Sequence, residues 1–229
     1  MEDPLDSIIT LAKHLMQAHG LTKQYQKRLL FKALNLSVGP GMCLGLTGPS
    51  GCGKTILMRV LAGLEPIEEG HVKCQGSLGW MLQNSALFPH MTLWENIIYA
   101  PLQANKIGKK EIFLQANKWL ARFHLAKQKA YYPNALSGGE AQRTALIRLM
   151  MVNPNVAMLD EPTSALDQKM TNVVAEVIEE KKYQGHRYIV ISHDQAFLEK
   201  IVDQTLTLGQ SGETMSNPAV KQQSIQPPR

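Results

Sequence analysis

The chain has 229 residues, of which 44% are hydrophobic and 19% charged, an ordinary balance for a globular protein. This length can bury a sizeable core, so we expect one domain that carries an inserted lobe. No stretch approaches the roughly 20 apolar residues that a membrane span requires. The acidic residues Glu2, Asp3 and Asp6 stand where a secretory signal would be basic, which argues against a signal peptide.

The three cysteines show no metal-binding spacing, and their odd number argues against a disulfide framework. We therefore expect a cytosolic protein. The net charge of +5 could indicate binding to nucleic acid or to anionic lipid. Because no compact cluster of Lys and Arg is interleaved with aromatic residues, a solubilising surface is the favoured explanation and no nucleic-acid partner is expected.

The first part of the chain predicts a strand, a glycine-rich loop and a helix. Residues 1–20 carry apolar side chains at a helical period and predict a short amphipathic extension. Residues 42–47 form an apolar run, so we expect a buried parallel strand there, followed by a helix over 55–64. A further strand is expected over 77–83. Residues 86–152 have helical character, with helices expected over 93–102, 110–123 and 140–152.

Strand character then returns over 156–160, 188–192 and 205–208, and a helix is expected over 171–182. Strands and helices thus alternate on both sides of a helical block, which predicts an α/β core with a helical insertion. Residues 209–229 are rich in Ser, Gln and Pro and poor in residues that form cores. We expect this tail to be disordered.

Residues 48–55, GPSGCGKT, match the phosphate-binding pattern G-x-x-x-x-G-K-[ST] between a predicted strand and a predicted helix. Backbone N–H groups of such a loop, and the positive end of the following helix, bind phosphate. We expect Lys54 to reach the β- and γ-phosphates and the Thr55 hydroxyl to hold Mg²⁺. An ordinary glycine turn is the alternative, and it leaves the lysine and the hydroxyl unexplained. Cys52 is expected to be a passive small residue, with a reactive thiol as the alternative.

Two acidic residues, Asp160 and Glu161, follow the apolar run over 156–159. Open α/β sheets bind ligands where their parallel strands end. Successive strand residues point to opposite sides, so the two carboxylates can have different roles. We expect Asp160 to reach Mg²⁺ and Glu161 to polarise the attacking water. A strand end capped by two solvated acids is the alternative.

Ser137 and Glu140 form the S-x-x-E pattern of a capping box at the start of a helix. Gly138 and Gly139 lie between them, although each glycine costs a helix about 1 kcal/mol relative to alanine. Leaving this helix start bare suits a phosphate that contacts exposed N–H groups. The capping role and a binding role therefore coexist.

The segment LSGGEAQR over residues 136–143 resembles the signature sequence of ABC-type ATPases, and the resemblance extends over residues 21–208. Gln83 resembles the Q-loop glutamine of this family, and His193 resembles its switch histidine. Residues 164–167, with Asp167, resemble the D-loop, and Tyr25 resembles the aromatic residue that stacks on adenine. The resemblance implies a P-loop NTPase core (21–85 and 153–208) with a parallel sheet, a small antiparallel β subdomain and an inserted helical subdomain (86–152).

The resemblance also implies the roles of the site residues. Tyr25 is expected to stack on the adenine of ATP, and Glu161 and His193 are expected to act at the γ-phosphate. The residues expected to contact the phosphates of the same chain's nucleotide are Gly48, Pro49, Ser50, Gly51, Cys52, Gly53, Lys54 and Thr55. Those expected to serve Mg²⁺ are Thr55, Gln83 and Asp160. Ser137 and Gly139 are expected to bind the γ-phosphate of the nucleotide held by the opposite subunit, and Gly138 and Asp167 are also expected to contact nucleotide. An ATP-dependent, head-to-tail homodimer, or a dimer with a related ATPase subunit, follows.

Within the family, the segments FPHMTLWENI, YYPNALSGGEAQR, LDEPTSALD and ISHDQAFLEKIVDQ are similar to ATPases of polar amino acid importers. This implies transmembrane permease subunits, a separate solute-binding protein and a place on the inner face of the cell membrane. Phe88, Pro89 and Met91 are expected to receive a helix of the permease, with a short buried segment as the alternative. The short spacing from Lys54 to Gln83 implies a trimmed β-hairpin around residues 70–79, and residues 144–150 replace the more usual A-R-A pattern.

Three other functions are alternatives to a transporter ATPase of this type. A soluble ABC-type ATPase of DNA repair or of the ribosome would usually carry tandem cassettes, coiled coils or basic extensions, which this sequence does not show. An exporter ATPase is an alternative because the sequence does not indicate the direction of transport. A P-loop kinase or GTPase would need a substrate lid or an N-K-x-D motif, and it would leave LSGGEAQR unexplained.

Overall fold

The computed structural model describes residues 16–25, 28–104, 106–209 and, for the backbone, 214–218. Its central sheet has six strands in the order β5 (Leu78–Met81), β6 (Val156–Asp160), β7 (Arg187–Ile191), β3 (Cys43–Thr47), β8 (Gln204–Leu208) and β9 (Thr214–Pro218). Neighbouring strands are parallel except for the β8–β9 pair. The carboxyl ends of five strands therefore lie at one edge of the sheet, where a ligand site is expected.

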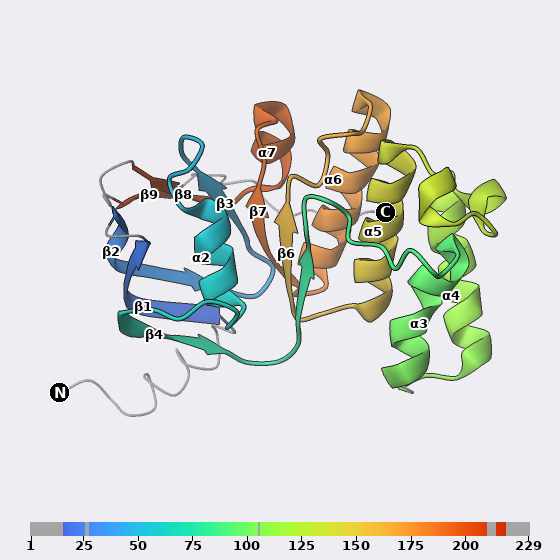
Figure 1. Ribbon diagram of the computed structural model, residues 1–229, viewed down its shortest axis with the longest axis horizontal. Coiled ribbons are helices and arrows are strands. Elements are labelled where there is room, and N and C mark those ends of the chain that lie inside the picture. Colours follow the sequence, from blue (N-terminus) through green and yellow to red (C-terminus); the bar gives the residue numbers. More distant parts are fainter. Residues whose placement is uncertain (1–15, 26–27, 105, 210–213, 219–229) are drawn as a thin grey trace.

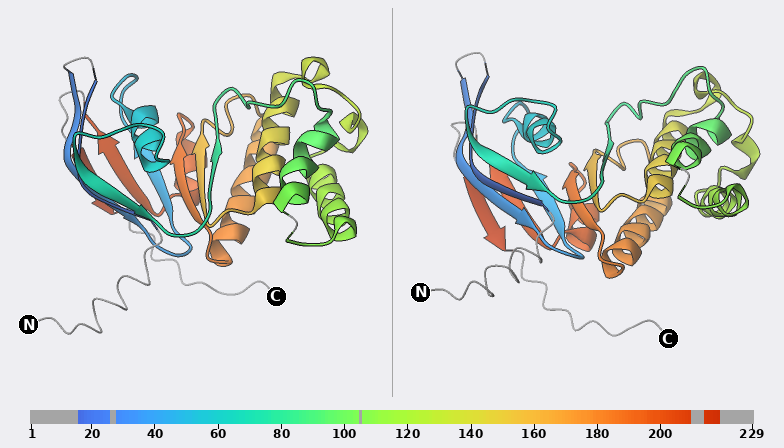
Figure 2. Two further views of the ribbon diagram at one scale, coloured as in Figure 1. Left: turned by 60° about the horizontal axis from the view of Figure 1, so that its bottom comes forward. Right: turned by 90° about the horizontal axis from the view of Figure 1, so that it is seen from below.

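A second, antiparallel sheet has the order β2 (Arg28–Val38), β1 (Met16–Tyr25) and β4 (Glu69–Cys74). The helices are α2 (Lys54–Leu61), α3 (Leu93–Ala104), α4 (Lys109–Arg122), α5 (Gly138–Val152), α6 (Gln168–Tyr183) and α7 (Gln195–Ile201). Helix α2 lies between the two sheets, whereas α5 and α6 cover the other face of the central sheet (Figure 1). Helices α3 and α4 form a lobe beyond α5, on the side away from the antiparallel sheet (Figure 2).

Two hydrophobic cores result from the pleat of the central sheet. In β6, Val156 and Met158 pack with α2 and the antiparallel sheet, whereas Ala157 and Leu159 pack with the helices on the opposite face. Strand β7 divides in the same way. Because both faces are covered, these parallel strands are apolar throughout, which explains why β6 is as the sequence predicts.

Three sequence expectations are wrong. Residues 16–20 belong to β1 and not to a helix, because Met16 and Ala18 alternate with exposed or half-exposed neighbours and are fully buried between β2 and β4. Residues 1–15 lie outside the described residues. In the tail that we expected to be disordered, Thr214–Pro218 forms β9, since pairing with β8 uses backbone groups and needs no core side chains. Residues 210–213 and 219–229 of this tail lie outside the described residues.

The expected β-hairpin over residues 70–79 is also absent from the described residues. Strand β4 pairs with β1 in the antiparallel sheet, whereas β5 pairs with β6 in the central sheet. Gly79 permits the close packing of β5, because a Cβ there would lie 2.8 Å from the Pro154 side chain and would also collide with Leu149. The segment therefore crosses from one sheet to the other. The limits that we assigned to the domain stay a prediction.

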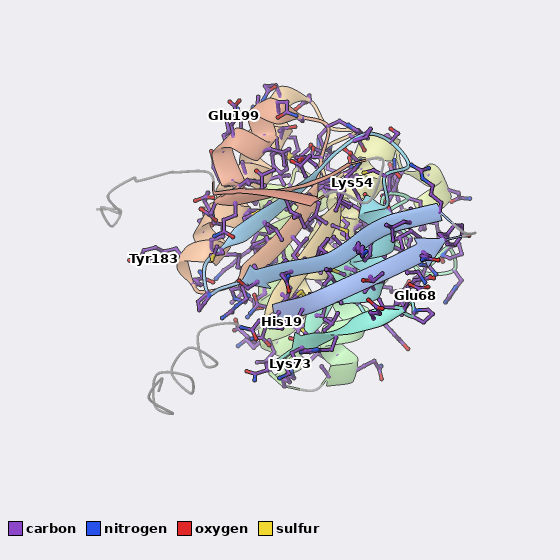
Figure 3. All side chains as sticks on the ribbon, turned by 90° about the vertical axis from the view of Figure 1, so that its left-hand side faces the viewer. His19, Lys54, Glu68, Lys73, Tyr183 and Glu199 are labelled. Atoms are coloured by element: carbon purple, nitrogen blue, oxygen red, sulfur yellow. The ribbon has the colours of Figure 1, made fainter. Side chains whose placement is uncertain are left out.

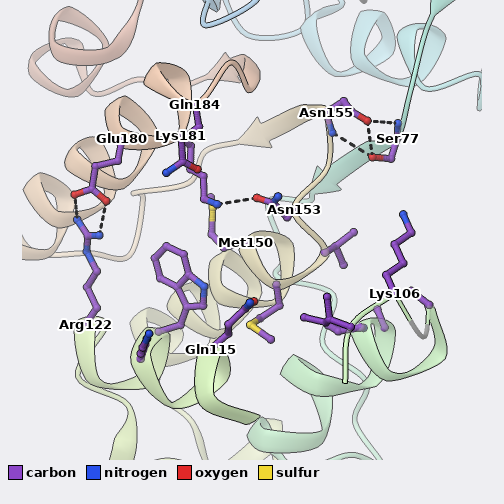
Figure 4. Close-up of a pocket in the computed structure, with 18 residues that line it drawn as sticks. Ser77, Lys106, Gln115, Arg122, Met150, Asn153, Asn155, Glu180, Lys181 and Gln184 are labelled. Carbon is purple, nitrogen blue, oxygen red and sulfur yellow. Dashed lines mark hydrogen bonds and ion pairs between the residues drawn. The ribbon is translucent and has the colours of Figure 1, made fainter. Parts of the chain in front are cut away.

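The predicted phosphate-binding residues and the main cavity lie at different edges of the central sheet. Figure 3 shows Lys54 near the top of the molecule, on the side of Glu199 in α7, with His19 and Lys73 on the lower side. At the edge where β5 and β6 begin, a cavity of about 830 Å³ opens between the helical lobe and the core, lined among others by Pro101, Trp119 and Met150 (Figure 4). This cavity contains none of the predicted site residues.

An ion pair between two residues that line this cavity joins the lobe to the core. Both terminal nitrogens of Arg122 in α4 donate to the carboxylate of Glu180 in α6, at 2.6 and 2.7 Å (Figure 4). This hydrogen bonding lowers the pKa of Glu180 and raises that of Arg122. The bidentate geometry makes this one of the stronger kinds of ion pair.

We expect a double-mutant cycle of Arg122→Met and Glu180→Gln to give a coupling of about 0.5 to 1 kcal/mol at pH 7, since both side chains are partly exposed and screened. The folded state lowers the pKa of Glu180, so the stabilisation is complete above the unfolded pKa and is lost as the pH falls through the folded pKa. Urea unfolding at several pH values measures the coupling. A cycle with Glu176→Gln is the control, and a coupling to Glu180 that does not change with pH would contradict the assignment.

Candidate functional site

The glycine-rich loop joins β3 to α2 in a conformation that only glycine adopts readily. Gly48 and Gly53 have φ values of 134° and 108°. A Cβ on Gly48 would collide with the carbonyl oxygen of Leu208 in β8, and one on Gly53 would lie 3.3 Å from the Leu30 side chain in β2. Gly53 caps α2 without a side-chain hydrogen bond. The first N–H groups of α2 are therefore left to an external acceptor such as phosphate.

Lys54, the first residue of α2, folds back over this loop. Its Nζ donates to the carbonyl oxygens of Gly48 at 2.7 Å and of Pro49 at 3.0 Å. Cys52 is 1% exposed, with its Sγ 3.9 Å from the same Nζ. The ammonium group is thus held above the loop, while Cys52 fills space beneath it.

Asp160 is the last residue of β6 and is 6% exposed. Burial raises the pKa of its carboxyl, whereas a hydrogen bond with Thr55 and the charge of Lys54 act in the opposite direction. Parallel strands β6 and β3 both adjoin β7, so the acid and the loop meet at the carboxyl edge. Asp160, Thr55 and Lys54 therefore form one cluster.

Glu161 lies in an unusual backbone conformation just beyond β6. Its φ is 52°, in the left-handed region, which costs a residue other than glycine about 1 to 3 kcal/mol. Its N–H donates to the carbonyl oxygen of Ile191, the last residue of β7, at 2.9 Å. The side chain is almost buried, and burial raises the pKa of its carboxyl, with the Asp160 charge acting in the same direction.

His193 follows β7 and faces Glu161. Its backbone N–H donates to Glu161 Oε2 at 3.3 Å, and its Nε2 lies 3.5 Å from Glu161 Oε1. The His193 side chain is 72% exposed. Glu161 Oε1 is buried and makes no hydrogen bond within the part of the chain that the structure describes. The carboxylate thus keeps one acceptor free beside the phosphate-binding loop.

The start of α5 has the predicted capping box. Ser137 Oγ accepts from the N–H of Glu140 at 3.3 Å, and the Glu140 carboxylate accepts from the Ser137 N–H at 2.8 Å. Gly138 is exposed, and a Cβ there would find its nearest neighbour at 3.9 Å. A Cβ on Gly139, however, would lie 2.7 Å from the carbonyl oxygen of Ala165. The second glycine thus also permits the close approach of the loop after β6.

Three further predicted residues have no described contact with this cluster. Asp167 caps α6, its Oδ1 accepting from the N–H of Met170 at 2.8 Å. Gln83 is exposed and lies two residues beyond β5, at the carboxyl edge. Tyr25 is 50% exposed at the end of β1, and no described contact joins it to the loop. The structure brings together Lys54, Thr55, Asp160, Glu161 and His193.

Comparison with known proteins shows the family. The family model described as ABC transporter matches residues 31–164. The glutamate transport ATP-binding protein GluA of Corynebacterium efficiens is 33% identical over 207 residues, which are 84% of this chain and 86% of that protein. The chain belongs to the ABC transporter family. It is an ATP-binding, ATP-hydrolysing subunit of that family, which sets aside the P-loop kinases and GTPases.

Other relatives and solved structures agree with this assignment. The arginine transport ATP-binding protein ArtM of Bacillus subtilis is 31% identical, covering 86% of this ABC ATPase and 88% of that protein. A structure of the ATP-binding subunit of an ABC transporter has a TM-score of 0.82 at 19% identity, covering 90% of each chain. A dimeric ATP-binding cassette in a post-hydrolysis state has a TM-score of 0.78 at 24% identity, covering 90% and 99%. These likenesses confirm the predicted P-loop NTPase fold.

Gln142 of this ABC ATPase was missed by the sequence analysis. It lies in α5, is 2% exposed and hydrogen-bonds the chain around Glu161. Its position within LSGGEAQR was the available signal. A glutamine on the buried face of a helix needs partners for both ends of its amide.

None of the helices in the described part of the chain combines the length and the apolar character that a membrane span requires.

We expect Gly139→Ala to destabilise this ABC ATPase by about 1 to 2 kcal/mol, because the new methyl group would collide with the Ala165 carbonyl. Gly138→Ala, the matched control, meets only an ordinary van der Waals contact at 3.9 Å and gains helix propensity, so its stability should stay equal or rise by up to about 1 kcal/mol. Urea unfolding midpoints of the two variants measure the difference. Equal stability of the two would show that the loop after β6 does not restrict residue 139.

Proposed function

We propose that the chain is the ATPase subunit of an importer for a polar amino acid or a similar small solute, and that it powers separate transmembrane subunits. Glutamate and arginine transport ATP-binding proteins are among its relatives over more than four fifths of the chain, which supports this solute class. The observation that carries the hydrolytic part is the buried Glu161 beside the phosphate-binding loop. Its Oε1 makes no hydrogen bond within the described residues, although His193 Nε2 lies 3.5 Å away.

The chain's own residues would divide the reaction as follows. Lys54 and the loop N–H groups over residues 48–53 would bind the phosphates, and Tyr25 would stack on adenine. Glu161 Oε1 would take the proton of the attacking water, because it is the acceptor left free next to Asp160. His193, 3.5 Å from that oxygen and largely exposed, would face the γ-phosphate.

The site also fits Mg²⁺. Thr55 and Asp160 present a hydroxyl and a buried carboxylate joined by a hydrogen bond, and both are hard oxygen ligands of the kind that Mg²⁺ prefers. The described residues contain no cluster of three or more His, Cys, Asp or Glu that could hold a metal alone. Mg²⁺ usually keeps several waters and needs substrate phosphates, so Thr55, Asp160 and Gln83 would hold it together with the nucleotide. It would supply charge neutralisation between the β- and γ-phosphates.

The exposed start of α5 supports a shared site. Ser137 and Gly138 are exposed and belong to a helix whose first N–H groups favour anions. We propose that Ser137, Gly138, Gly139 and Asp167 contact the nucleotide of a second subunit in an ATP-dependent, head-to-tail dimer. The post-hydrolysis cassette of similar fold is dimeric.

The loop after β5 supports attachment to membrane subunits from the cytosolic side. Asn96 is fully buried and hydrogen-bonds both the N–H and the carbonyl oxygen of Phe88, at 2.8 and 3.1 Å. Arg148 donates to Ser85 and Ala86 and lies 5.5 Å from the Phe88 ring centroid. Phe88, 40% exposed, pairs edge-on with the exposed Tyr99. A rigid loop that presents aromatic rings suits a partner helix.

Complementation between two inactive variants tests the shared site. Glu161→Gln should bind ATP, hydrolyse it at least about 100-fold more slowly and form a stable dimer with ATP, because the proton acceptor is gone. Ser137→Arg should bind ATP as a monomer and fail to hydrolyse it. A mixture of the two should regain activity, because each mixed dimer contains one intact site made from Lys54 and Glu161 of one chain and Ser137 of the other. Steady-state ATPase assays measure this, and full activity of strictly monomeric protein would refute the dimer.

Replacing Phe88 tests the attachment to membrane subunits. We expect the tagged Phe88→Asp chain to lose its membrane subunits when it is purified from detergent extracts of its native membranes. ATP binding by the purified chain should stay within about 2-fold of the wild type. Leu114→Asp, on α4 and 49% exposed, is the matched control for an added charge at an exposed apolar residue. Wild-type protein that brings down no membrane subunit would favour the soluble ABC-type ATPase, and a solute efflux system among its partners would favour the exporter.

A further inference from the structure

The buried amide of Gln142 links the signature helix to the catalytic end of β6. Its Nε2 donates to the carbonyl oxygen of Glu161 at 2.7 Å and lies 3.1 Å from Ser164 Oγ. Its Oε1 accepts from the N–H of Ala165 at 2.9 Å. The side chain therefore spans the turn that begins at Glu161 and the loop that follows it.

These partners determine the orientation of the amide. A carbonyl oxygen such as that of Glu161 only accepts and a backbone N–H such as that of Ala165 only donates, so a flipped amide would oppose like groups at both ends. Ser164 also donates to the Glu161 carbonyl, from Oγ at 3.2 Å and from its N–H at 3.4 Å. One carbonyl thus has three donors, of which the Gln142 amide is the nearest.

This arrangement holds a strained residue. Glu161 has a φ of 52°, which persists only where the surroundings impose it. Ile191 accepts from its N–H and Gln142 donates to its carbonyl, so both peptide groups of Glu161 are fixed. The direction of the Glu161 side chain follows from this backbone conformation. A reacting carboxylate misplaced by about 1 Å can lose on the order of 100-fold in rate.

Gln142 lies in the first two turns of α5. Ser137 caps this helix, and Gly139 contacts the same Ala165 whose N–H bonds to Gln142. We propose that Gln142 is a positioning residue, which holds Glu161 of its own chain in place. This inference rests on the proposed dimer, in which the start of α5 meets the nucleotide of the partner subunit. Gln142 would thus connect the helix that contacts the partner's nucleotide to the Glu161 that acts on its own. Gln142 contacts neither nucleotide and acts through the backbone of Glu161.

Gln142→Met tests the positioning role, because methionine matches the length of glutamine and cannot hydrogen-bond in its place. We expect kcat to fall about 10- to 100-fold, with the KM for ATP unchanged within about 3-fold. Gln128→Met is the matched control: Gln128 donates to Glu140 at the same helix start at 2.9 Å and does not touch Glu161. Its kcat should stay within about 2-fold. Equal effects of the two substitutions would overturn the proposal.

Mixed dimers separate positioning of Glu161 from support of the signature helix. One chain carries Glu161→Gln, so hydrolysis occurs only at the Glu161 of the other chain. Gln142→Met in the chain with intact Glu161 should lower the rate at least about 10-fold. The same substitution in the Glu161→Gln chain should leave the rate within about 2-fold. The opposite pattern, or equal losses in both arrangements, would overturn the proposal.

Two further variants keep the result interpretable. Ser137→Arg in the Glu161→Gln chain should abolish the remaining hydrolysis, and undiminished activity would mean that the shared site itself fails, whatever Gln142 does. Ser164→Ala removes another donor to the Glu161 carbonyl at an exposed residue and carries less risk of misfolding. It should lower kcat about 3-fold with an unchanged KM. An unchanged kcat in both Ser164→Ala and Gln142→Met would overturn the proposal.

Discussion

The chemistry of this protein depends on the parallel pairing of β3, β6 and β7. Strand β7 lies between the other two, with Leu46 and Asp160 both opposite Ile191. The phosphate-binding loop, the acidic pair and His193 each lie at or just beyond the end of one of these strands. They are far apart in the sequence and come together because parallel strands end at one edge of a sheet. A slip of one residue in this register would turn every side chain of a strand to the other face.

The two acidic residues differ for a reason that strand alternation alone does not supply. We expected successive side chains of one strand to take separate roles. Asp160 is the last residue of β6, whereas Glu161 is already in a left-handed turn with its peptide groups bonded to β7 and α5. Asp160 therefore points toward Thr55 and Lys54 while Glu161 points toward His193. Local strain, held by neighbouring elements, separates the acids.

The sequence predicts those parts of the fold whose signal is both local and long. Strand β6 agrees with its prediction at both ends, because burial on two faces makes it apolar throughout. Helices α5 and α6 agree closely, since their apolar period extends over several turns. The sequence predicts a helix for residues 16–20 of β1, because their strand pattern becomes visible only once β2 and β4 cover them. Strand β9 has no side-chain signal, since it depends on backbone pairing.

The candidate site shows the same division. The spacing of Gly48, Lys54 and Thr55 is local and is visible in the sequence alone. The reason for Gly139, the nearby Ala165 carbonyl, is a tertiary contact. The partners of Gln142 lie 19 to 23 residues away in the sequence, so the amide gave no local sign of what it bonds. A residue that acts through the backbone of a distant residue therefore cannot be recognised from local sequence patterns.

The strand order also determines when this protein can fold during synthesis. Strand β3 lies between β7 and β8, and the N–H of Cys43 bonds to an Asp203 carboxylate 160 residues further along the chain. The phosphate-binding loop therefore emerges from the ribosome long before the neighbours that hold its strand in place. Closing such distant contacts is slow and exposes apolar segments to aggregation in the meantime. Nascent chains that end before β8 should therefore depend on chaperones, however complete their loop sequence is.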